Sequence, residues 1–330
     1  MNRRDYLAGV TGAATMMAWT SERAFAQQRF DGAPTAAPIK LIAPFPPGGT
    51  VDILARALTL SLTPALNRPM VVENKGGAGG TVGADIAAHS PADGNTLLFA
   101  TAHHAIAQSV YPKLGYDIQA DFAPVAFLGR VNHVLICNKA LPVTNVLELV
   151  DYLKRNPGRL NYGTPGSGTL HHLMAEQFKA ASGTSMQHVP YKGSGQAMVD
   201  LIAGQIHVYF ETMPSALQHI RNKSVRALAV TSQRRSEHLP NVPTVAESGL
   251  PGYDASSWYG LLVPKGTPPR FIDQLNKAVN AVYEDPNFVV RWTELGAERG
   301  GGTPQDLGKL LADEVGRWSK VATTANIKVE

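Results

Sequence analysis

The sequence predicts an α/β protein built as two lobes, each with a mostly parallel sheet, and three observations carry that prediction. Short apolar segments alternate with segments of helical period from residue 39 onward, as in parallel sheets covered by helices. The alternation starts afresh near residue 147, so that two such units follow one another. At a prior of about 150 residues per domain, 330 residues suffice for two domains, and a composition of 44% apolar and 17% charged residues excludes disorder.

Residues 1–26 have the features of an export signal. Arg3 and Arg4 precede an apolar stretch over 8–19, and Ala-Phe-Ala at 24–26 has the small-x-small pattern that a signal peptidase cleaves. The stretch is shorter than the roughly 20 residues that span a membrane. Two arginines followed by x-Tyr-Leu resemble a twin-arginine signal, and an ordinary N-terminal helix is the alternative. We therefore expect a cleavable signal over 1–26 and a periplasmic mature protein.

The first unit predicts three strands and two helices. Its strands are short apolar runs, and Pro44 ends the first of them. Its first helix has apolar residues at Val51, Leu54, Leu58 and Leu62, which is a helical period. The predicted order is strand 39–43, helix 50–62, strand 70–73, helix 83–89 and strand 96–100.

The second unit repeats the architecture without repeating the sequence. Its predicted order is helix 147–154, strand 160–162, helix 170–181, strand 186–191, helix 196–203, strand 206–210, helix 215–221 and strand 225–230.

Beyond Pro251 one predicted strand, 258–263, precedes helices only, over 271–283, 288–295 and 307–323. A segment of helices cannot form a third sheet, so we expect it to pack back on lobe 1. The chain should then cross between the lobes near 128–136 and 253–263. The predicted lobes are 38–135 with 255–330 for lobe 1, and 136–254 for lobe 2.

Three glycine-rich segments stand between a predicted strand and the helix that follows it: 44–50, 163–169 and 191–195. Glycine lets the backbone approach a ligand, and a helix N-terminus presents unpaired N–H groups with roughly half a positive charge. In open parallel sheets, ligands bind beyond the carboxyl ends of the strands, where these segments lie. Two lobes that face each other would form a cleft suited to a small carboxylate. The alternative is that the three glycine-rich segments are only tight turns between strand and helix. A fourth glycine cluster, at 76–80, is explained as well by a turn as by ligand contact.

Several motifs occur in a fixed order along the chain: PPGGTVD at 46–52, ENKGGAGG at 73–80, YGTPGSGT at 162–169, HVPYKG at 188–193 and LPNVPTVAESG at 239–249. With these motifs the sequence resembles the substrate-binding receptors of tripartite tricarboxylate transporters, the Bug-type family. The resemblance implies a two-lobed periplasmic-binding-protein fold of the type II, Venus flytrap kind. It also implies capture of a small organic carboxylate without a cofactor, and delivery to an inner-membrane permease of the tripartite tricarboxylate type.

In the family, the first Pro-Gly-Gly loop and the loop of the second lobe hold the ligand carboxylate, partly through water. His172 matches the histidine that follows the second loop, and Phe45 would supply an apolar wall. Lys192 is either a cation for the carboxylate or a surface lysine. The candidate ligand-binding residues are Phe45, Pro47, Gly48, Gly49, Thr50, His104, Thr164, Gly166, Ser167, Gly168, Thr169, His172, Lys192 and Glu211.

The chain departs from the family pattern where ligand selectivity should lie. His103-His104 stands in place of Thr-His, and Ala107-Gln108 in place of Asn-Pro. Glu211, in place of Asp or Asn, follows a predicted strand and should face the cleft, where it would bind a ligand ammonium or hydroxyl group or close an interlobe hydrogen bond. These departures leave the identity of the carboxylate open.

The main rival class is an enzyme, but the sequence holds no G-x-S-x-G, G-x-x-x-x-G-K-[ST] or H-E-x-x-H motif. Adjacent histidines do not share a helix face, so His103-His104 and His171-His172 do not predict a metal site. We expect His104 and His172 in the cleft, and His103 and His171 at the surface or in hydrogen bonds. The lone Cys137 excludes an intrachain disulfide and is expected to be a buried apolar residue.

The leading hypothesis is a monomeric periplasmic solute-binding protein without catalysis. A formal charge of +4 with no block of like charges makes no case for nucleic acid as a partner. Two alternatives stay open: an α/β hydrolase or transferase with an interlobe active site, and a ligand receptor that reports to a sensor kinase.

Overall fold

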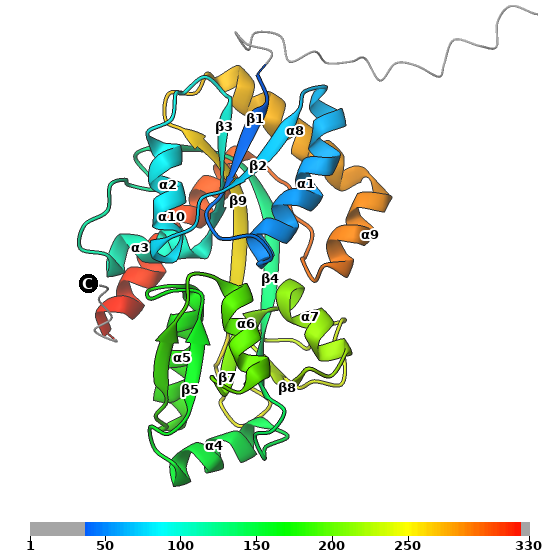
Figure 1. Ribbon diagram of the computed structural model, residues 1–330. Helices are drawn as coiled ribbons and strands as arrows, with labels where there is room; N and C mark the ends of the chain where they lie inside the picture. The colour runs from blue at the N-terminus through cyan, green and yellow to red at the C-terminus, as the bar shows by residue number, and fades with distance from the viewer. Residues whose placement is uncertain (1–36, 325–330) are drawn as a thin grey trace, which may run out of the picture.

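The structure is a computed structural model that describes residues 37–324, so the predicted signal at 1–26 lies outside the described residues. Two lobes lie one above the other and are joined by long strands (Figure 1). The strands follow one another in the order β2-β1-β3-β9-β4-β7-β5-β6, and β8 pairs with β4. Within residues 37–324, no helix has the length and apolar character needed to cross a membrane.

Lobe 1 begins with strands and helices that alternate as the sequence predicts. Strand β1 is buried along most of its length because it lies between β2 and β3, both parallel to it. Helix α3 is an addition to the predicted elements. The elements are β1 (Ile39–Ala43), α1 (Thr50–Leu66), β2 (Met70–Asn74), the 3₁₀ turn η1 (Ala78–Gly80), α2 (Thr81–Ala88), β3 (Thr96–Thr101) and α3 (Ala102–Val110).

Lobe 2 has the same design, with β5 between β6 and β7 in parallel pairing. Helices α5, α6 and α7 each begin directly after a strand of this sheet or a short turn from it. The elements are α4 (Val146–Arg155), β5 (Asn161–Thr164), α5 (Leu170–Ser182), β6 (Gln187–Pro190), α6 (Ser194–Ala203), β7 (Val208–Thr212), α7 (Met213–Arg221) and β8 (Val225–Val230).

Strand β4 (Phe122–Asn138) belongs to both lobes. Up to Asn132 it pairs with β9 (Ser256–Pro264), and from His133 onward it pairs with β7 and β8. All of these pairings are antiparallel, as is that of β3 with β9. The mostly parallel sheets that the sequence predicts are therefore limited to β2-β1-β3 and β7-β5-β6, because a strand shared by two lobes must leave the βαβ pattern. The lobe boundaries at 135/136 and 254/255 stay predictions.

The C-terminal helices pack on lobe 1, as predicted. Helix α8 (Pro269–Glu284) lies against α1 and β4, α9 (Pro286–Glu294) follows it, and α10 (Pro304–Thr324) lies against α3 and β4. A buried indole of β9 ties α10 to the sheet, because Trp258 donates from Nε1 to Glu314 Oε2 at 3.1 Å, and Trp318 on α10 itself donates to the same oxygen at 2.9 Å. The three helices therefore close lobe 1 and add no third sheet.

Candidate functional site

A small cavity of about 20 Å³ lies between the lobes, beyond the carboxyl ends of β1, β3, β5 and β7. It is lined from both sides. Lobe 1 contributes Phe45, Pro46, Gly49, Thr50, Val51, Thr101, His103 and Tyr259, and lobe 2 contributes Pro165, His171, Ser194 and Thr212.

Five helices start at this cavity. Gly49 and Thr101 are the residues that precede α1 and α3, and Thr212 precedes α7. Ser194 is the first residue of α6, and His171 lies in the first turn of α5. Since each helix N-terminus carries partial positive charge and unpaired N–H groups, their convergence makes the cavity favourable for an anion.

The lobes are closed on each other around the cavity. Thr50 and Thr212 share a hydrogen bond between their Oγ1 atoms across the two lobes. Tyr111 in lobe 1 donates its hydroxyl proton to the carbonyl oxygen of Ser167 in lobe 2, at 2.9 Å. The structure is thus a closed conformation of a two-lobed protein.

Tyr111→Phe removes one interlobe hydrogen bond and leaves the ring in place. A neutral hydrogen bond contributes about 0.5–1.5 kcal/mol, so we expect the Kd for a bound carboxylate to rise about two- to tenfold. Titration calorimetry measures this change, and Tyr152→Phe on the outlying helix α4 is the matched control. An unchanged Kd for Tyr111→Phe would show that this bond does not stabilise the closed, ligand-bound state.

The first glycine-rich loop reaches the cavity with only part of its predicted residues. Gly49 and Thr50 line it, and so does Phe45. Pro47 and Gly48 are exposed, and the N–H of Gly48 donates to Asp52 Oδ2 at 3.0 Å. Gly48 has φ +85, which favours glycine, so its role here is to turn the chain into α1.

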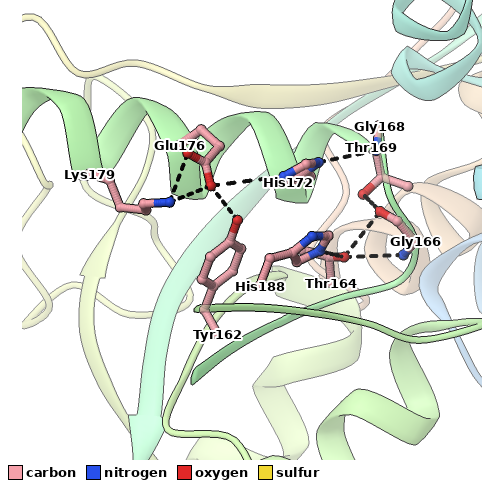
Figure 2. A network of polar contacts seen from close by, with 9 residues as sticks. All are labelled: Tyr162, Thr164, Gly166, Gly168, Thr169, His172, Glu176, Lys179 and His188. Carbon is pink, nitrogen blue, oxygen red and sulfur yellow. Dashed lines mark hydrogen bonds and ion pairs between the residues drawn. The ribbon is translucent and has the colours of Figure 1, made fainter. Parts of the chain in front are cut away.

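The second loop is held by its own hydrogen bonds, as Figure 2 shows. Thr164 Oγ1 accepts from the N–H of Gly166 at 3.3 Å, and Thr169 Oγ1 donates to the carbonyl oxygen of Gly166 at 2.8 Å. The N–H of Gly168 donates to His172 Nδ1 at 3.2 Å. Ser167 meets Tyr111, and Pro165 is the loop residue that lines the cavity. A direct ligand contact by Thr164, Gly166, Ser167, Gly168 or Thr169 stays a prediction.

His172 supports this loop and does not line the cavity. Its ring stacks on that of His188, with 4.0 Å between centroids, and His188 Nε2 is 2.6 Å from Thr164 Oγ1 (Figure 2). Behind them Glu176 accepts from Tyr162 and from Lys179. Burial lowers the pKa of His172 and lowers that of His188 to about 4, so both rings are neutral and His172 Nδ1 can accept from Gly168.

The prediction for the two histidine pairs is wrong in both cases. His103 and His171 line the cavity and are buried, with 6% and 3% exposure. His104 turns into lobe 1, where its Nδ1 accepts from the N–H of Thr101 at 3.0 Å and completes a capping box for α3. Adjacent residues on a helix point about 100° apart, so only one of each pair can face the cavity.

Two further predicted residues lie away from the cavity surface. Glu211 is fully buried behind Thr212, and its Oε1 accepts from the N–H and the Oγ1 of that residue, both at 2.7 Å. Lys192 is exposed, and Ser194 lines the cavity in its place. Four lining residues are absent from the predicted set: Ser194, Thr101, Thr212 and Tyr259. The first three are hydroxyl residues at the start of a helix, which is a signal that the sequence carries.

The described part of the chain supports neither of two other kinds of site, a metal site or a cysteine nucleophile. No group of three or more His, Cys, Asp or Glu residues within 37–324 is arranged to hold a metal ion. Cys137 is buried, and burial raises its pKa to about 11, so the thiol stays protonated at neutral pH and is a poor nucleophile.

Comparison with known proteins places this geometry in a family. A sequence model described as tripartite tricarboxylate transporter family receptor matches residues 54–327. Protein BugT from Bordetella pertussis (strain Tohama I) is 39% identical over 297 residues, which cover 89% of this chain and 91% of BugT. The match therefore extends over nearly the whole of both proteins.

Solved structures agree with it. Rpa4515 from R. palustris with adipate is 38% identical with a TM-score of 0.86, over 88% of this chain and 98% of that one. MatC from Rhodopseudomonas palustris with bound malate is 30% identical with a TM-score of 0.81, over 86% and 98% of the two chains. These neighbours confirm the two-lobed periplasmic-binding-protein fold. The chain belongs to the receptor family of tripartite tricarboxylate transporters, the Bug-type periplasmic solute-binding proteins.

Proposed function

We propose that this protein captures a small organic carboxylate in the interlobe cavity and delivers it to an inner-membrane permease of the tripartite tricarboxylate type, without chemical change. One observation supports this above the others: five helices from both lobes start at the cavity. Their N–H groups and dipoles favour an anion, and the hydroxyl group of Ser194 adds a donor of adjustable direction, while those of Thr50 and Thr212 bond to each other across the lobes. Relatives with bound adipate and malate support a dicarboxylate.

Closure of the lobes completes the proposed site. A cavity of about 20 Å³ has the room that one water molecule needs, which is less than a four-carbon dicarboxylate requires. The lobes must therefore separate to admit a ligand, and when they close on it they must leave a larger cavity than in this structure. A ligand selects the closed state only by binding it more tightly than the open state, so it must contact both lobes.

The deciding experiment measures the melting temperature of the protein with a panel of mono- and dicarboxylates, adipate and malate first. Titration calorimetry and small-angle scattering follow. We expect a dicarboxylate to raise the melting temperature and to make the protein more compact. Adipamide, which has the same chain without charge, is the control ligand and should not bind. Failure of every carboxylate would overturn the proposal, and formation of a product would favour the hydrolase or transferase instead.

We further propose that the receptor acts as a monomer in the periplasm after export by the twin-arginine route. Dependence of carboxylate uptake on the receptor distinguishes a transport receptor, which works with a permease, from a receptor that signals to a sensor kinase. Deletion of the receptor gene should abolish uptake of the bound carboxylate, whereas a receptor for a sensor kinase would change gene expression and leave uptake intact.

A further inference from the structure

The cavity offers a bound carboxylate few sources of full positive charge. Among the described residues that line it, none is Lys or Arg, and only His103 and His171 can become cations. The helix N-termini supply partial charges. A carboxylate that loses its water in a closed cavity therefore either depends on partial charges or acquires a proton nearby.

His103 belongs to a buried cluster of imidazoles drawn from both lobes and from the shared strand. Its ring lies 5.3 Å from that of His171 on α5, which in turn lies 4.9 Å from that of His133 on β4. The Nδ1 atoms of all three rings, and Nε2 of His171, are buried without a hydrogen-bond partner in the part of the chain that the structure describes. Unpartnered polar atoms at this depth destabilise the closed conformation, and a ligand that reaches His103 or His171 removes part of that penalty.

The surroundings of His103 keep it neutral until an anion arrives. Burial, and then the proximity of His171, His104 and His133, hold the pKa of His103 well below its usual range. Another neighbour is the uncharged ring of Phe45, in a T-shaped contact with 5.1 Å between the ring centroids. The buried carboxylate of Glu211, on β7, lies 3.7 Å from His171 Nε2.

His171 and Glu211 already form a pair. Burial favours the protonated form of Glu211, but its interactions with His171 and with Thr212 hold the pKa of Glu211 below its usual value. His103 has no such carboxylate, so the ligand itself would be its first anionic neighbour. That difference assigns the two histidines different roles in the same cavity.

We propose that this protein binds a carboxylate together with one proton, which His103 takes up as the ligand enters the cavity. The inference rests on the proposed function, since it specifies how the same cavity balances the charge of its ligand. The imidazole of His103 gains a proton from solvent, one N–H bond forms, and no other bond changes. The imidazolium then pairs with the ligand carboxylate, in a cavity where the attraction between them is weakly screened.

The test is titration calorimetry with adipate, or malate if adipate gives no heat, at about pH 7.5 in phosphate, HEPES and Tris buffers. These buffers differ in ionisation enthalpy. The slope of the observed binding enthalpy, plotted against the ionisation enthalpy of the buffer, gives the number of protons taken up per ligand. We expect about one proton per ligand for the natural protein, and a Kd that rises about tenfold per pH unit above neutrality. His103→Gln should bring the slope close to zero, while His89→Gln, at an exposed histidine on the surface of lobe 1, should keep it near one.

The possible outcomes separate this inference from the function on which it rests. Binding of adipate or malate with a slope of zero overturns proton uptake and leaves the proposed function standing. A slope near one in His103→Gln overturns the assignment to His103. If that variant fails to fold, the ¹⁵N shifts of labelled histidine rings in the natural protein decide, because one ring must become an imidazolium on saturation. No binding by any carboxylate overturns the proposed function and this inference together.

Discussion

A Gly49→Trp variant is expected to lose carboxylate binding by about a hundredfold or more while it remains folded. Gly49 precedes α1 with φ −87, a conformation that any residue adopts. A Cβ there would meet only Ser194 Cβ at 3.8 Å and the carbonyl oxygen of Pro46 at 3.9 Å, so the backbone tolerates a side chain. The indole beyond that Cβ would fill a cavity of about 20 Å³ and keep Ser194, in the opposite lobe, away. Two lost hydrogen bonds to a charged ligand, each about 1.5–3 kcal/mol, account for the effect.

Leu60→Trp is the matched control, because Leu60 lies on the same helix α1 with 71% of its surface exposed. Circular dichroism should show both variants folded, and calorimetry with adipate should show normal affinity for the control alone. Scattering should find that saturating adipate compacts the natural protein and the control, and leaves Gly49→Trp unchanged. Normal affinity in Gly49→Trp would place the ligand outside the cavity.

The second large effect is a loss of stability in mild acid. Burial lowers the pKa of His104 to about 4 from an ordinary value of 6.5, and burial also lowers the pKa of His103 and His133. The unfolded chain therefore binds more protons than the folded protein between about pH 6.5 and pH 4, so the free energy of unfolding falls as the pH falls through that window. His104 alone should remove about 2 kcal/mol between pH 7 and pH 5, and the others add to it.

Denaturant unfolding at pH 7 and pH 5 measures the loss, and His104→Gln isolates one contribution. Glutamine is a preferred third residue of a capping box, so the variant should keep the cap on α3 that Thr101 and His104 form. We expect little change at pH 7 and a gain of about 2 kcal/mol over the natural protein at pH 5. Equal stability of the natural protein at the two pH values would contradict the depressed histidine pKa values.

Much of the fold follows from hydrophobic periodicity, because most apolar residues of the predicted strands and helices are buried. Strand β4 shows where this reasoning stops. Its 17 residues are partly buried against different partners in the two lobes, so no single period runs along it, and only its middle was predicted as a crossing. Helix α3 was not predicted either, since Ala102–Val110 is short and is nearly all buried, which leaves no polar face to mark its period.

In the candidate site, the backbone was easier to predict than the side chains. The three glycine-rich loops marked the starts of α1, α5 and α6 correctly, because close backbone packing restricts the residue type. The choice between His103 and His104 depends on the rotation of α3 about its axis. The capping box fixes that rotation. The N–H of Thr101 donates to His104 Nδ1, so His104 turns inward and His103 faces the cavity. The sequence contains the threonine, but the usual partner in a capping box is Glu or Gln, so a histidine at the third position does not signal the motif.

Strand β4 also has a consequence for how the molecule assembles. Its first part completes the sheet of lobe 1 and its last part completes that of lobe 2, with the exchange of partners between Asn132 and His133. Lobe 2 is therefore formed by one continuous stretch of the chain, from the end of β4 to β8, whereas lobe 1 is complete only with β9 and the C-terminal helices, the last part of the chain to be synthesised. The strands of lobe 2 can thus all pair once β8 has left the ribosome, whereas lobe 1 must wait until nearly the whole chain has been released.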